Sequence, residues 1–70
     1  MKELFINTEY IKLDQALKFS AVSDSGAAAK AVILEGLVKV NGEVCLLRGK
    51  KLRENDIFSF NSQEFIIKKG

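Results

Sequence analysis

Hydrophobic residues follow two spacings along this chain, and the change from one to the other separates predicted strands from predicted helices. The run Glu3–Asn7 contains a compact apolar segment with β-branched and aromatic residues, which is typical of a short strand. From Leu13 onward the apolar residues recur at helical spacing, and we predict a helix that ends near Ala21 or Val22. The residues expected to pack inward from this helix are Leu13, Ala16 and Leu17.

A second helix is predicted from Ala27 to about Glu35. Ser25 or Asp24 can cap its start by accepting a hydrogen bond from a free backbone N–H, and Gly36 is placed to end it in a left-handed conformation. The stripe of this helix that we expect to be buried consists of Ala29, Val32 and Ile33. The opposite side has almost no bulky side chains, because it consists of Ala27, Ala28 and Ala31. The bare side indicates either close packing against another element or room for a broad ligand to approach the backbone.

Short strands joined by turns fill the C-terminal half of the chain. Asn41-Gly42 is a strong hairpin signal because both positions tolerate positive φ, and Leu52 is expected to anchor the core. The predicted strands are Leu37–Val40, Glu43–Leu46, Ile57–Phe60 and Glu64–Ile67, and Lys68–Gly70 is expected to be a frayed basic end. The whole pattern predicts an α+β fold in which two short helices pack on a small, mostly antiparallel sheet.

Length and composition exclude several classes of protein. Seventy residues make a single domain, 1–70, and no apolar run approaches the roughly 20 residues that cross a bilayer. Met1–Tyr10 lacks the form of a signal peptide, so we expect a cytoplasmic protein without membrane contact. With no histidine and with Cys45 as the only cysteine, we expect no metal, no cofactor and an inert, half-buried thiol. The sequence also lacks a P-loop and a Rossmann glycine pattern, so we do not expect an enzyme.

The positive charge is unevenly distributed along the sequence. Between positions 39 and 53 there are five cations and one anion, a local excess of 5 − 1 = +4, although the whole chain carries only +2. The members of this group are Lys39, Arg48, Lys50, Lys51 and Arg53, with Glu43 as the anion. Such an excess favours a surface for a polyanion, although lysines that merely keep a loop solvated would produce the same pattern.

A set of motifs occurs in a definite order along the chain: Lys12-Leu13-Asp14, Leu17, Ser25, Ala29-Lys30, Ile33, Gly36, Val38, Val40-Asn41-Gly42 and Asp56-Ile57. This order resembles a known family, the alpha-L RNA-binding domain, which is the module of the fourth protein of the small ribosomal subunit. The motifs span roughly residues 11–60, and the basic stretch Arg48–Leu52 is similar to that of small stand-alone bacterial members. The resemblance implies a non-catalytic module that binds structured RNA, with ribosomal RNA as the expected target and a role in ribosome assembly.

The resemblance and the charge pattern together give a set of candidate RNA-binding residues. These are Lys12, Lys18, Ser25, Gly26, Lys30, Lys39, Arg48, Lys50, Lys51 and Arg53. We expect the cations among them to come together beside the start of the second helix, on one nearly bulk-free surface. Gly26 stands where many relatives have arginine, and Lys12 and Lys30 also replace arginines. Lysine lacks the planar fork that arginine offers to phosphate, so we expect weaker binding by the helical half.

Two alternatives stay open on the sequence alone. Val40–Glu43 and Leu52–Asp56 also look like pieces of a ubiquitin-like sulfur carrier, but that family needs a flexible Gly-Gly end, whereas this sequence has Lys69-Gly70. The other alternative is a small protein-interaction module whose basic loop contacts an acidic partner. The leading hypothesis is a monomer that binds ribosomal or tRNA-like RNA, with ribosomal particles as an expected partner.

Overall fold

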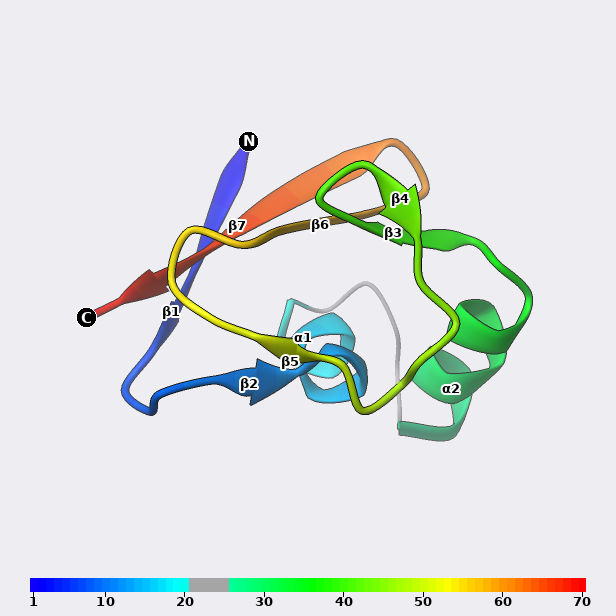
Figure 1. Cartoon of the computed structure of the whole chain (residues 1–70), viewed down its shortest axis with the longest axis horizontal. Coiled ribbons are helices and arrows are strands. Elements are labelled where there is room, and N and C mark those ends of the chain that lie inside the picture. Colours follow the sequence, from blue (N-terminus) through cyan, green and yellow to red (C-terminus); the bar gives the residue numbers. More distant parts are fainter. Residues whose placement is uncertain (21–25) are drawn as a thin grey trace.

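The computed structural model describes residues 1–20 and 26–70, which form two helices and seven strands (Figure 1). The bounds are β1 Lys2–Ile6, β2 Ile11–Lys12, α1 Leu13–Phe19, α2 Gly26–Leu34, β3 Val38–Val40, β4 Glu43–Val44, β5 Lys51–Leu52, β6 Ile57–Phe60 and β7 Gln63–Lys69. Ser25 and Asp24, the predicted caps of the second helix, lie outside the described residues. Neither described helix has the length or the apolar character to cross a membrane.

The strands form two sheets that enclose the core together with the helices. Five strands lie in the order β1-β7-β6-β3-β4, while β2 and β5 make a separate antiparallel ladder. In Figure 1 the larger sheet runs across the top, the ladder and α1 lie below it, and α2 lies to the right. The largest fully buried side chains come from every one of these layers: Phe58, Leu13, Leu17, Ile33, Leu52, Ile67 and Val38. The predicted α+β fold, with two helices on a mostly antiparallel sheet, is confirmed.

Both helices bury the faces that their sequences predict. Leu13, Ala16 and Leu17 are buried in α1, and Ala29 and Ile33 are buried in α2, with Val32 half-buried. Helix α1 ends at Phe19 in the described part of the chain, and Ala21 and Val22, near which its end was predicted, lie outside the described residues. The hydroxyl of Ser20 donates a hydrogen bond of 3.0 Å to the carbonyl of Leu17, which offers the backbone a local alternative to further helix.

Residues with positive φ mark the predicted turns. Gly36 ends α2 at φ +77°, and the hairpin between β3 and β4 has Asn41 at +52° and Gly42 at +88°. These values confirm the left-handed helix stop and the two-residue hairpin. The return strand is shorter than predicted, since β4 covers only Glu43–Val44. The Asn41 side chain links the hairpin to the start of β6, because its amide oxygen accepts a hydrogen bond of 3.0 Å from the backbone N–H of Ile57.

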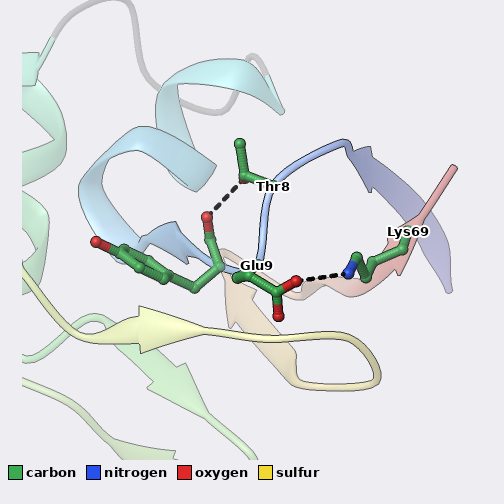
Figure 2. Close-up of polar contacts among 4 residues, drawn as sticks. Thr8, Glu9 and Lys69 are labelled. Atoms are coloured by element: carbon green, nitrogen blue, oxygen red, sulfur yellow. Dashed lines mark hydrogen bonds and ion pairs between the residues drawn. The ribbon is translucent and has the colours of Figure 1, made fainter.

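The predicted frayed end at Lys68–Gly70 is wrong. Strand β7 continues to Lys69 and pairs in parallel with β1, with Phe5 opposite Lys68 and Ile6 opposite Lys69. The N–H of Gly70 donates to the carbonyl of Ile6 at 3.1 Å, and the Lys69 ammonium lies 3.2 Å from the Glu9 carboxylate (Figure 2). The partners of these basic residues are some 60 positions away in the chain, so local charge gave no hint of them.

Candidate nucleic-acid interface

The β2–β5 ladder places two lysines directly opposite each other on the molecular surface. Ile11 pairs with Leu52 and both are buried, so the neighbouring pair, Lys12 and Lys51, faces outward. Like charges directly opposite in an antiparallel pair destabilise it. The arrangement is therefore unfavourable for folding, which is the kind of feature expected where a surface serves a charged ligand.

Tyr10 lies beside this ladder and collects two further cationic groups. The Lys51 ammonium is 4.9 Å from the centroid of the Tyr10 ring, and the Arg53 guanidinium carbon is 5.8 Å from it. The Thr8 hydroxyl donates a hydrogen bond of 2.8 Å to the Tyr10 carbonyl, which helps fix the turn that leads into β2 (Figure 2). Cation–π contacts of this kind hold both side chains near one ring and limit their freedom. The sequence analysis missed Tyr10, because its partners become apparent only when β2 and β5 are paired.

The basic turn before β5 is attached to the start of α1 by backbone hydrogen bonds. The N–H groups of Leu13 and Asp14 donate to the carbonyls of Lys50 and Arg48, at 2.9 and 3.1 Å. Within the turn, the Lys50 N–H donates to the Leu47 carbonyl at 3.1 Å. These bonds satisfy two N–H groups that a helix start otherwise leaves free. They leave the side chains of Arg48 and Lys50 exposed on a fixed backbone.

We call the exposed cations of the ladder and the turn the basic face. Its members are Lys12, Arg48, Lys50, Lys51 and Arg53. The ion pair found within residues 1–20 and 26–70 joins Lys69 to Glu9, so none of the basic-face cations is neutralised by a described carboxylate. The uncompensated charge of this face is available to an anionic partner.

The remaining candidates lie at different distances from the basic face. Lys30 is exposed on α2 one turn before Leu34, which lines a hollow with Arg48 and Lys50. The expectation that the cations gather beside the start of α2 stays a prediction: the turn is bonded to the start of α1, and it lines a hollow with Leu34, the last residue of α2. Gly26, eight residues before Leu34, is about 12 Å further along the helix. It is exposed, and a Cβ built on it meets no atom within 4 Å.

Two more lysines and one serine complete the candidate set. Lys18 is exposed on α1 one turn after Asp14, whose N–H binds the basic turn. Lys39 lies between the buried Val38 and Val40, so its side chain points from the outer face of the large sheet, away from the core. Ser25 falls outside the described residues. The structure thus groups most of the cations around α1 and the ladder and sets Lys39 apart.

Comparison with known proteins identifies the family of the chain. A family model described as "S4 domain" matches residues 4–68 of the 70-residue chain, which confirms the resemblance seen in the sequence. The match extends beyond the 11–60 stretch that carries the motifs, and it favours this family over the sulfur carriers. A search of curated proteins found no match. S4 domains generally bind RNA and are not themselves catalytic, so the family supports a coarse RNA-binding role for this chain. The chain belongs to the S4 domain family.

Proposed function

We propose that this protein binds structured ribosomal RNA through the basic face and acts, as a monomer and without catalysis, in ribosome assembly. The carrying observation is the pairing of Lys12 with Lys51 beside a turn that presents Arg48 and Lys50. Double-stranded RNA is read mainly by shape, phosphates and 2′-hydroxyl groups. A protein that recognises RNA in this way needs cations at fixed separations, and the ladder and the backbone-anchored turn supply them.

The proposed RNA surface extends from the basic face along both helices. Lys18 on α1 and Lys30 on α2 add exposed cations beyond the turn. Gly26 leaves open space at the first residue of α2, where a phosphate chain can approach the backbone closely. Lys39 lies outside this surface and offers a matched control.

Salt-dependent titration tests the RNA surface. Labelled ribosomal RNA hairpins are titrated from 0.05 to about 0.4 M salt with the wild-type chain, with the double variant Arg48→Glu/Lys50→Glu, and with Lys39→Glu. Each lost phosphate contact lowers the slope of log affinity against log salt by about 0.7–0.9, so the double variant should lose about 1.5 units. Lys39→Glu should keep the wild-type slope. A wild-type affinity that does not depend on salt would refute phosphate recognition.

The ribosomal part of the proposal needs a separate measurement. We expect the tagged protein, expressed at its natural level, to sediment with incomplete ribosomal particles, and the double variant to stay near the top of the gradient. Competition of transfer RNA and of an unrelated RNA hairpin against the ribosomal RNA hairpin measures the preference of the protein for ribosomal RNA. Equal binding to all three RNAs, together with no sedimentation on particles, would leave an RNA-binding protein whose target is not the ribosome.

A further inference from the structure

A cluster of exposed leucines borders the basic turn, and RNA binding does not account for it. Leu34, Leu46 and Leu47 leave 58%, 54% and 68% of their surfaces exposed. Together with Arg48, Gly49 and Lys50 they line a hollow of about 430 Å³, which we call the leucine hollow. The elements that supply it are the end of α2 and the segment that links β4 to β5. Apolar surface gathered in this way and rimmed by charge marks an interaction site more often than isolated exposed side chains do.

The leucine hollow continues into a second depression. A neighbouring hollow, also of about 430 Å³, shares Leu46, Leu47 and Lys50 with it and extends to Val44, which is 54% exposed. Glu43 is the one described carboxylate that lines either depression, and it lines only the second. The leucine hollow itself therefore combines apolar walls with two uncompensated cations, Arg48 and Lys50.

We propose that the leucine hollow binds an acidic amphipathic helix of a partner protein. A helix presents apolar side chains at i, i+3, i+4 and i+7, which can fill a groove walled by leucines, and acidic residues beside that stripe can pair with Arg48 and Lys50. The charge of the rim thus selects an acidic partner over a basic one. The inference goes beyond the proposed RNA function and does not depend on its ribosomal target.

Two other occupants fit the hollow less well. Unpaired RNA bases are bound mainly by stacking on aromatic or arginine planes. Among the described residues the leucine hollow offers one such plane, Arg48, and its walls are leucines. A second copy of this chain docked on the same patch would bring the Arg48 and Lys50 pairs of both copies together. That like-charge contact opposes association. An acidic helix avoids both problems.

Nuclear magnetic resonance of the full-length chain, labelled at the leucine methyl groups, tests the proposal. The probes are two 18-residue helical peptides with the same leucine stripe, one flanked by glutamates and the other by lysines. We expect the glutamate peptide to shift the methyl signals of Leu34, Leu46 and Leu47 and to bind at least tenfold more tightly than the lysine peptide. Equal binding of the two peptides, or no shift at these leucines, would overturn the proposal.

Variants separate this surface from the RNA surface. Leu34→Ser/Leu47→Ser should weaken glutamate-peptide binding at least tenfold while leaving RNA affinity and its salt slope unchanged. Leu37→Ser, at a residue that is 53% exposed and outside the leucine hollow, is the matched control and should bind the peptide normally. All three substitutions are at exposed positions, and a thermal melt checks folding. A loss of RNA affinity in Leu34→Ser/Leu47→Ser would assign the patch to RNA, and leucine shifts caused by raising the protein concentration without a probe would assign it to self-association. Either result would refute the protein partner.

Discussion

Replacing Lys12 with glutamate should make the protein more stable and a poorer RNA binder. In the folded chain Lys12 faces Lys51 across the β2–β5 ladder, so Lys12→Glu converts a like-charge pair into an opposite-charge pair, a change of about 0.2–1 kcal/mol. Lys12 is also the N-cap of α1, where an acidic group interacts favourably with the helix dipole by about 0.3–1 kcal/mol. A net gain of about 1 kcal/mol raises the melting temperature of a domain of this size by about 4–8 °C.

The same substitution removes one proposed phosphate contact from the basic face. A contact that contributes about 0.7–0.9 to the salt slope is worth about five- to eightfold in affinity at 0.1 M salt. Charge reversal also adds repulsion, so the loss for Lys12→Glu should be at least that large. Stability and RNA affinity are therefore expected to move in opposite directions.

Thermal melts at low and high salt, together with RNA titrations, check both parts. Salt near 1 M shortens the screening length to about 3 Å, so the gain in melting temperature should shrink there. Lys39→Glu is the control, because it makes the same change in net charge opposite the uncharged Val44 and Ser59. A Lys12→Glu protein that melts below the wild type would refute the argument from like charges. An equal loss of RNA affinity in Lys39→Glu would mean that net charge, and not the basic face, governs binding.

Three further substitutions test the fold and the edge of the RNA surface. Gly26→Arg introduces the arginine that the family resemblance implies at this position, and its Cβ meets no atom within 4 Å, so RNA affinity at 0.1 M salt should rise by about five- to eightfold in the same titration. Gly42→Ala forces an L-residue to φ +88° and should lower the free energy of unfolding by about 1 kcal/mol or more in urea, whereas Gly49→Ala, which has open space and no positive φ, should have little effect. Leu52→Ala removes a fully buried side chain and should lower the free energy of unfolding by about 2–5 kcal/mol in the same urea measurement. A variant as stable as the wild type would contradict this prediction.

The sequence predicted the elements whose signals are local. The two helical stripes, the glycine stop at Gly36 and the Asn41-Gly42 hairpin depend on residues within a few positions of one another, and each was found where the pattern placed it. The failed prediction of a frayed C-terminal end concerns a partner that is distant in the chain. Strand β7 extends through Lys69 because β1 lies alongside it, and no local feature of a basic C-terminal segment indicates a parallel neighbour.

The same distinction between local signals and distant partners applies to the candidate interface. The sequence supplied its cations, but it could not show that Lys12 and Lys51, nearly forty residues apart, would stand opposite each other. It also gave no role to Tyr10, whose ring is approached by Lys51 and Arg53 only in the folded chain. The β2–β5 ladder is too short, at two residues a strand, to leave a detectable alternation of polar and apolar positions.

Such a short ladder with two facing lysines needs support from elsewhere in the fold, and that support explains how the interface is built. Ile11 and Leu52 bury their side chains on its inner side, and α1 begins directly after β2 with its first N–H groups bonded to the carbonyls of the basic turn. Core burial and helix formation thus offset the repulsion between the lysines. Because the carbonyls that receive these bonds belong to Arg48 and Lys50, the contacts that stabilise the start of α1 also fix the backbone of the cationic side chains. Loss of that helix start would disperse the basic face even with every cation retained.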